Sequence, residues 1–260
     1  VFKVYLSTTR KEVFRPMDTI SELFNICDPK NPPSEENYVD LCSERGGTSV
    51  VSVLEKRIRR SESYTHLLFS GHPGGGKSTE LRRLREKLDQ SDPRFFTVYM
   101  DADEYINRQD VDIVEIFLAI IGSLAETLRQ DENIDIDSPI LEKRWNEIKE
   151  VFSSEMELEK IEISLGKLAK FVTKLKKSDN ETRQKVRKML SPQLPSILDE
   201  TNLILSDARI KLKQKGYHDL VLVIDNLEKI IDVIDPDTNK GTYYRIFIAG
   251  GQQLSLIEAN

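Results

Sequence analysis

Apolar positions along the chain form three short runs of the kind that β-strands show. Tyr64–Ser70 is apolar and β-prone, Phe95–Met100 is nearly continuous, and Leu220–Ile224 contains only apolar residues. An unbroken apolar run is typical of a strand that is buried on both faces of a parallel sheet. The pattern therefore predicts an α/β fold in which a parallel sheet is flanked by helices.

Helical periodicity fills the segments between these runs. After the first run, Leu81, Leu84 and Leu88 are spaced to lie on one face of a helix. Val111–Leu128 is strongly apolar and predicts a helix that packs on the sheet, whereas Val50–Arg60 predicts an amphipathic helix. These helices would supply the layers that cover the sheet.

A long charged segment, about residues 131–214, separates the second apolar run from the third. Its pattern is mostly helical, and three prolines divide it: Pro139, Pro192 and Pro195. Ile161–Leu165 alternates, which leaves a short strand open, before helical spacing resumes at Leu168. We therefore expect a helical insertion in a core that spans residues 64–260, with residues 1–63 as an N-terminal approach segment.

A glycine-rich loop joins the first predicted strand to the helix that follows it. Gly71, Gly76, Lys77 and Ser78 fit the spacing G-x-x-x-x-G-K-[ST]. Glycine reaches positive φ without a steric penalty, so the backbone N–H groups can turn inward and bind phosphate oxygens. Lys77 would reach the β- and γ-phosphates, and the Ser78 hydroxyl would bind Mg²⁺. The predicted nucleotide-binding residues are Gly71, His72, Pro73, Gly74, Gly75, Gly76, Lys77, Ser78 and Thr79.

The third apolar run ends in a carboxylate, Asp225. Ligands of open α/β sheets bind at the carboxyl ends of the strands, so Asp225 is a candidate Mg²⁺ ligand beside the glycine loop. Glu228 is the candidate catalytic base that orients the attacking water, or alternatively a residue that starts a helix. Asp101 and Asp103, after the second run, either support the metal site or cap the next helix, and capping is favoured.

Charge narrows the range of partners. The 260 residues include 38 Lys and Arg against 44 Asp and Glu, and the net charge of -6 argues against a generic DNA-coating protein. One basic island, Lys167–Lys188, contains only Asp179 and Glu181 as acidic residues. A solvated helix face is favoured there over a contact for nucleic acid or an acidic partner, because aromatic stacking residues are nearly absent.

Cysteine usage and hydropathy bear on the cellular compartment. Cys27 and Cys42 form no disulfide framework, and neither has metal-ligand spacing to another cysteine or a histidine. No signal peptide opens the chain, and the longest apolar stretch, Ile113–Ile121, is too short for a membrane span. We therefore expect a cytoplasmic protein without a membrane partner.

Together, the segments Gly71–Thr79 and Val221–Lys229 resemble the Walker A and Walker B motifs of the additional-strand P-loop ATPases, in particular the AAA+ and STAND types. The resemblance implies a P-loop NTPase core that uses ATP and Mg²⁺, with Lys77 and Glu228 as catalytic residues. Many of these ATPases carry the catalytic acid directly after the Walker B aspartate, where this chain has Asn226.

The resemblance also implies further parts of the family's architecture. A sensor strand, a closing strand and a lid or arginine finger would follow, so the sheet of this chain is expected to be incomplete at its C-terminal end. The approach segment often contacts adenine in such ATPases, which makes Tyr38, Val39 and Arg45 candidate base neighbours. Ordinary packing of these residues against the sheet is an equal alternative.

The favoured hypothesis is an ATP-binding and ATP-hydrolysing module of a larger regulatory protein, in which water attacks the γ-phosphate. A second hypothesis is a nucleotide-gated interaction or assembly module with little turnover. A third is an origin-loader-like, DNA-associated ATPase. Expected partners are ATP or ADP, together with a protein partner or further copies of the chain.

Overall fold

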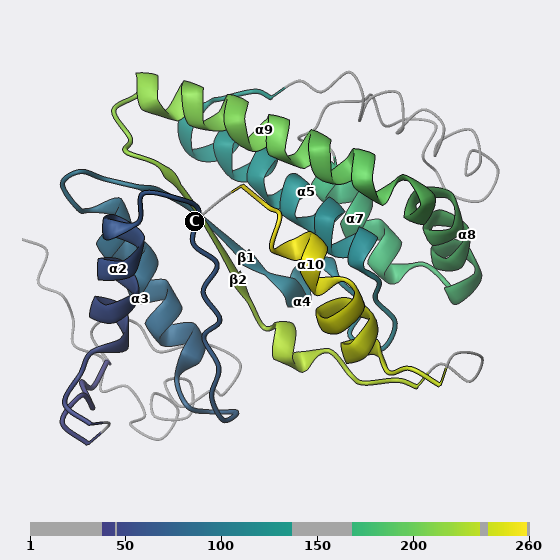
Figure 1. The fold of residues 1–260 in the computed structure, drawn as a ribbon, viewed down its shortest axis with the longest axis horizontal. Coiled ribbons are helices and arrows are strands. Elements are labelled where there is room, and N and C mark those ends of the chain that lie inside the picture. The colour runs from purple at the N-terminus through teal and green to yellow at the C-terminus, as the bar shows by residue number, and fades with distance from the viewer. Residues whose placement is uncertain (1–37, 45, 137–167, 235–238, 259–260) are drawn as a thin grey trace, which may run out of the picture.

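The computed structural model of the protein describes residues 38–44, 46–136, 168–234 and 239–258. Within these ranges it is an α/β structure with one two-stranded parallel sheet (Figure 1). In chain order, the elements are α2 (Val50–Arg60), α3 (Lys77–Asp89), β1 (Phe96–Asp101), α4 (Ala102–Tyr105), α5 (Ile113–Glu132), α7 (Leu168–Lys177), α8 (Asn180–Leu190), η3 (Ser191–Gln193), α9 (Leu194–Gln214), β2 (Leu220–Asp225), η4 (Leu227–Lys229), η5 (Tyr244–Ala249) and α10 (Gly251–Leu254).

The sheet joins two segments that lie far apart in the sequence. β1 and β2 run parallel, with Phe96 opposite Leu220 at one end and Asp101 opposite Asp225 at the other. This pairing confirms the second and third predicted strands to within one residue at each end. Because the strands are parallel, their two terminal aspartates lie at the same edge of the sheet.

Helices cover both faces of the sheet. Phe96, Val98 and Met100 of β1 belong to a core cluster with residues of α5, α7 and α9. Val221 and Val223 of β2 belong to a second cluster with residues of α2 and α3. Figure 1 shows α2 and α3 on one side of the strands, with α5, α7 and α9 on the other. Helix α3, which follows the glycine loop, therefore packs directly on the sheet.

Helix α5 confirms the prediction of a buried helix over Val111–Leu128. It begins two residues later, at Ile113, because Asp112 caps its first turn in a reciprocal capping box with Glu115. Its buried positions run almost without interruption through the first three turns. α7 packs closely on it, since a Cβ placed on Gly122 would lie 2.9 Å from the backbone of Ala169. Such a contact leaves no room for any larger residue at this position.

From Leu168 onward, the described part of the predicted insertion is mostly helical, as expected, whereas residues 133–136 are not helical. α7, α8 and α9 fill residues 168–214 with the short turn η3 between them, and both Pro192 and Pro195 lie in the first turn of a helix. This is the position that proline tolerates, since it needs no N–H donor there. Pro139 and the alternating segment Ile161–Leu165 lie outside the described residues.

The first predicted strand is wrong, because Tyr64–Ser70 pairs with no other strand of the described chain. The segment alternates between half-buried and exposed residues, as a strand with one packed face would. Leu67 packs against the cluster formed by α2, α3 and β2, whereas Leu68 is 93% exposed. A strand also needs a neighbour that supplies ladder hydrogen bonds, and local sequence carries no information about that neighbour.

Two arginines of the basic island form ion pairs with carboxylates near the start of α5. We call this group the arginine cluster: it consists of Arg183, Arg187, Asp110 and Glu115. Arg187 lies 2.5 Å from Asp110 and 2.9 Å from Glu115, and Arg183 lies 2.9 Å from Asp110. Burial works to raise the pKa of Asp110, but its hydrogen bonds and charge contacts with the two arginines bring it below the ordinary value. These two cations therefore hold α8 against the start of α5, which neither interpretation of the basic island had foreseen.

Removing Arg187 should destabilise the fold. We expect Arg187→Ala to lower the free energy of unfolding by about 3–5 kcal/mol, because it leaves buried Glu115 without its cation. Urea denaturation measures this loss. Lys188→Ala is the matched control, since the neighbouring lysine is exposed and its loss should change stability by less than about 0.5 kcal/mol. Equal effects of the two substitutions would contradict the structural role of the cluster.

Two further expectations concern the membrane and the cysteines. Among the helices of the described residues, none combines the length and the apolar character that a transmembrane span requires. Cys42 is a free thiol, and Cys27 lies outside the described residues.

Candidate functional site

The glycine-rich loop turns sharply into the N-terminus of α3. Gly74 and Gly76 have φ angles of +74° and +80°, the positive values that the loop's glycines were expected to allow. Gly75 is restricted differently, since a Cβ there would lie 3.0 Å from the carbonyl oxygen of His72. Gly71 has neither restriction, because a Cβ would meet the Lys77 side chain at an ordinary 3.8 Å. Positive φ angles therefore favour glycine at Gly74 and Gly76, and a tight backbone contact disfavours a larger residue at Gly75.

Lys77 lies at the centre of this loop. Its Nζ atom donates to the carbonyl oxygens of Gly71 and His72 at 3.2 and 3.4 Å. The same atom forms an ion pair with Glu228 at 2.9 Å, although the two residues are separated by most of the chain. The two predicted catalytic residues are thus brought together, with the ammonium group where the loop carbonyls and a carboxylate converge.

Asp225 is buried at the carboxyl end of β2, with an exposed fraction of 3%. One carboxylate oxygen accepts the N–H of Asn226 at 2.8 Å, and the other accepts the Tyr99 hydroxyl at 2.5 Å. Burial, and then the hydrogen bond to Asp225, raise the pKa of Tyr99 far above its ordinary value, so the hydroxyl stays protonated and donates. Both oxygens of Asp225 are therefore held in place.

The segment after β2 is anchored to the end of β1. Asn226, at a φ of 67°, caps the short helix η4, and its side chain donates to Asp101 at 2.8 Å. Lys229 forms an ion pair with Asp103 at 3.0 Å. Asp101 also caps α4 by accepting the N–H of Asp103, which confirms the expected capping role. These contacts fix the position of η4, the turn that carries Glu228.

Ser78 and Thr79 lie half-buried in the first turn of α3. No hydrogen bond joins Ser78 to Asp225 within the described ranges, so the two predicted metal ligands are not linked directly. Nor does any group of three or more His, Cys, Asp or Glu side chains in those ranges have the geometry to hold a metal ion alone. A metal ion at these residues would need additional oxygen ligands.

That donor set fits Mg²⁺, which is held in proteins by one or two carboxylates together with substrate phosphates and water. Asp225 accepts two hydrogen bonds, and an ionised carboxylate offers about four acceptor positions. The remaining positions of Asp225 accept no hydrogen bond from the described residues. The loop before Ser78 is exposed from Gly71 to Gly75, so phosphates have access to it.

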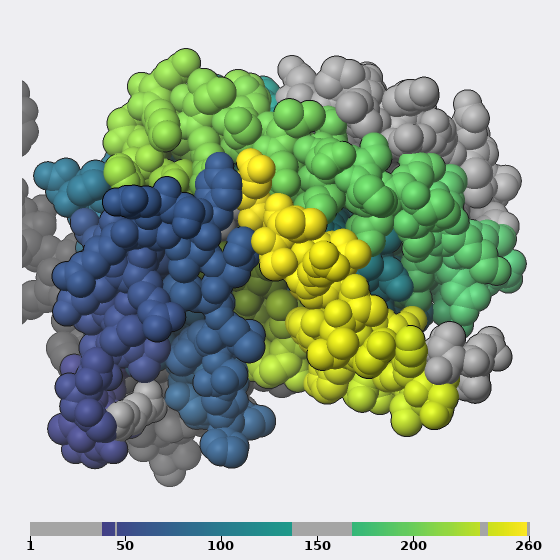
Figure 2. Space-filling view, viewed as in Figure 1, coloured from purple at the N-terminus to yellow at the C-terminus, as the bar shows by residue number. Residues whose placement is uncertain are grey.

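The surface is hollowed beside the loop. Figure 2 shows a depression between the blue segment that includes the glycine loop and the yellow C-terminal segment, with the chain around β2 at its floor. His66, six residues before His72 of the loop, contacts Ile257 of the C-terminal segment, since the ring Nε2 and the carbonyl oxygen are 2.8 Å apart. The hollow therefore lies between the segment that leads into the glycine loop and the C-terminal segment.

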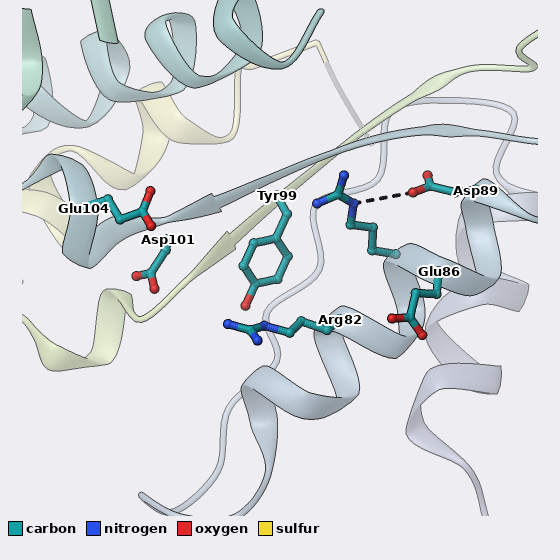
Figure 3. Close-up of a pocket in the computed structure, with 7 residues that line it drawn as sticks. Arg82, Glu86, Asp89, Tyr99, Asp101 and Glu104 are labelled. Carbon is teal, nitrogen blue, oxygen red and sulfur yellow. Dashed lines mark hydrogen bonds and ion pairs between the residues drawn. The ribbon is translucent and has the colours of Figure 1, made fainter. Parts of the chain in front are cut away.

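A second cavity, of about 560 Å³, opens between α3 and β1. Its lining carries both signs of charge: Arg82, Arg85, Glu86, Asp89, Tyr99, Asp101 and Glu104. In Figure 3, Arg82 extends from α3 toward the hydroxyl end of Tyr99, while Arg85 pairs with Asp89. The guanidinium of Arg82 lies 6.0 Å from the centre of the Tyr99 ring. Arg82 and Tyr99 thus border the space next to Asp225.

Sequence reasoning missed Tyr99. The signal was present, since Tyr99 is the one hydroxyl-bearing aromatic residue in a run of otherwise apolar character that ends next to Asp101. Its contact with Asp225 depends on the register of the sheet, in which Tyr99 lies opposite Val223 and one diagonal step from Asp225. Such diagonal neighbours lie within reach of an aromatic side chain.

The candidate adenine neighbours are only partly described. Tyr38 donates a hydrogen bond to Glu80 at 3.0 Å, and the guanidinium of Arg83 lies 3.7 Å from the centre of its ring. Tyr38 therefore packs against α3, whereas the packing alternative expected contact with the sheet. Val39 is 70% exposed, and Arg45 lies outside the described residues. Contact of these residues with adenine stays a prediction.

Comparison of the chain with protein-family models, with curated proteins and with solved structures gives no match. The site is therefore interpreted from its own geometry.

Proposed function

We propose that the chain is a P-loop ATPase module of the AAA+/STAND-like kind, which binds ATP and Mg²⁺ at Gly71–Thr79 and hydrolyses the γ-phosphate. The observation that carries the proposal is the 2.9 Å ion pair between Lys77 and Glu228. It joins a glycine loop at a helix N-terminus to the carboxyl ends of two parallel strands, which is where α/β proteins bind phosphates.

Phosphate binding would rearrange the contacts of Lys77. The N-terminus of α3 and the loop N–H groups attract anionic oxygens. Lys77 would exchange its contacts with Glu228 and the loop carbonyls for the β- and γ-phosphate oxygens. The same exchange would release the Glu228 carboxylate, which is then free to accept a proton from water and to orient that water toward the γ-phosphate.

Ser78 and Asp225 would hold Mg²⁺ together with the phosphates. When bound, the ion supplies positive charge that neutralises the phosphate oxygens. Asp225 is suited to this task because it is buried and both its oxygens are held by hydrogen bonds. The anchoring of η4 through Asn226 and Lys229 keeps Glu228 close to the same point.

A second candidate function, a nucleotide-gated assembly module with little turnover, is favoured by the exposed apolar side chains that follow Glu228. Ile234 is 61% exposed and Ile248 is 67% exposed, and Ile231, Val233, Tyr244 and Phe247 are also exposed. Nucleotide binding would break the ion pair between Glu228 and Lys77, and this change would act on the apolar segment that follows Glu228. Light scattering and a phosphate-release assay together distinguish the two functions. A nucleotide-dependent change in molecular mass without phosphate release supports assembly alone.

The backbone of the loop offers a test of ATP binding at this place. We expect Gly76→Ala to weaken ATP binding about tenfold, because an alanine at a φ of +80° costs about 1–2 kcal/mol and pulls the loop away from this shape. Gly216→Ala is the matched control, since it introduces the same backbone strain at a φ of +87° before the amino end of β2, outside the loop. Titration calorimetry measures both affinities. A Gly76→Ala variant that binds ATP no more weakly than the control would place the nucleotide elsewhere.

A further inference from the structure

The Asp225 carboxylate carries a support that the Walker motifs do not include. Tyr99, on the neighbouring strand β1, donates its hydroxyl to one carboxylate oxygen at 2.5 Å. The backbone N–H of Asn226 donates to the other oxygen at 2.8 Å. With one donor on each oxygen, the carboxylate plane is fixed relative to the sheet.

The ring of Tyr99 is itself held. Tyr99 packs against the cluster of Val221, Val223, Leu84 and Leu88, on the face of the sheet that α3 covers. Asp225 shares that face with Val221 and Val223, since alternate residues of a strand point the same way. The hydroxyl therefore reaches Asp225 from an aromatic ring that is anchored between α3 and the strands.

We propose that Tyr99 is the positioning residue that orients Asp225 toward Mg²⁺ of the bound nucleotide. The proposal rests on the proposed function, because it concerns the metal ligand of the same site. Groups that orient a metal ligand fix its geometry, and their loss typically reduces metal affinity about 10–100-fold. Without the hydroxyl, the buried carboxylate keeps only the Asn226 N–H and can rotate away from the loop.

The test compares ATP binding with and without Mg²⁺ in the wild-type chain and in Tyr99→Phe, which removes the hydroxyl and keeps the ring. We expect unchanged ATP affinity in the presence of a metal chelator. The Mg²⁺ concentration that half-maximally tightens ATP binding should rise about tenfold. A role in packing alone would change the metal-free affinity or the unfolding midpoint and would leave the Mg²⁺ requirement unchanged.

Tyr105→Phe is the matched control. Tyr105, in α4, donates its hydroxyl to Glu126 at 3.4 Å and forms no hydrogen bond with the loop or with Asp225 in the described chain, so its loss should leave the Mg²⁺ requirement unchanged. A double-mutant cycle with Asp225→Asn is the second measurement. Once Asp225 is neutralised, Tyr99→Phe should have no further effect on the Mg²⁺ requirement.

The outcomes separate the two proposals. Equal Mg²⁺ requirements in Tyr99→Phe and the wild-type chain would overturn the role of Tyr99 and leave the proposed function standing. An effect of Tyr99→Phe that persists in full in the Asp225→Asn background would also overturn it. A wild-type chain whose ATP binding does not respond to Mg²⁺ would overturn the role of Tyr99 and the Mg²⁺ part of the proposed function together.

Discussion

Glu228→Gln should bind ATP at least as tightly as the wild-type chain and should release phosphate about 10²–10⁴ times more slowly. The loss of turnover follows because glutamine has the size of glutamate but accepts no proton from the attacking water. The retained binding follows from the ion pair between Lys77 and Glu228, which phosphates must displace in the wild-type chain. Removing this competitor should tighten ATP binding up to about fivefold, since a partly exposed pair contributes about 0.2–1 kcal/mol.

Titration calorimetry and a steady-state phosphate assay measure the two effects separately. Glu62→Gln is the control, because Glu62 is an exposed glutamate in the connection before the loop. It should change neither quantity. Unchanged turnover in Glu228→Gln would remove Glu228 from the role of base. Weaker ATP binding in Glu228→Gln would show that the carboxylate supports the loop and does not compete for Lys77.

The sequence predicted the parts of the fold that depend on local pattern. Leu220–Asp225 was recognisable because its apolar residues are consecutive, and α5 because its apolar residues are continuous over several turns. The conformation of Gly74 and Gly76 was also predictable, since phosphate loops need positive φ angles that glycine provides. Each of these features is encoded by a few neighbouring residues.

The features that the sequence did not reveal are contacts between distant segments. Tyr64–Ser70 has the pattern of a strand, but pairing depends on a neighbour that the segment does not encode. Arg187 contacts Glu115, which lies 72 residues away in the sequence. Because the sequence does not reveal this partner, the pattern indicated that Arg187 belongs to a solvated basic face. Tyr99 reaches Asp225 across 126 residues and through the register of the sheet. In each case tertiary packing decides which partner a side chain meets.

Lys77→Ala should reduce ATP affinity by about 100-fold, to the limit of detection. Lys77 is the cation at the centre of the loop, with its ammonium group in reach of two loop carbonyls and Glu228. Hydrogen bonds to charged groups contribute about 1.5–3 kcal/mol each, and the corresponding affinity change is about 10–150-fold. The substitution should leave α3 intact, because Lys77 is the first residue of this helix and alanine has the highest helix propensity.

Lys87→Ala is the matched control. Lys87 lies on the same helix, about 15 Å further along, where it pairs with Glu55 at the surface. Its loss removes the same charge from α3 and leaves the glycine loop untouched. Circular dichroism and thermal unfolding without nucleotide verify that both variants are folded.

The central claim is that Lys77 and its loop bind the phosphates of ATP. The most direct test is titration calorimetry, in which Mg²⁺ and ATP are added to the wild-type chain, Lys77→Ala and Lys87→Ala. We expect saturable ATP binding with equal affinity in the wild-type chain and Lys87→Ala, and ATP binding about 100-fold weaker in Lys77→Ala. Equal affinity in all three proteins, or no binding to the folded wild-type chain, would contradict it.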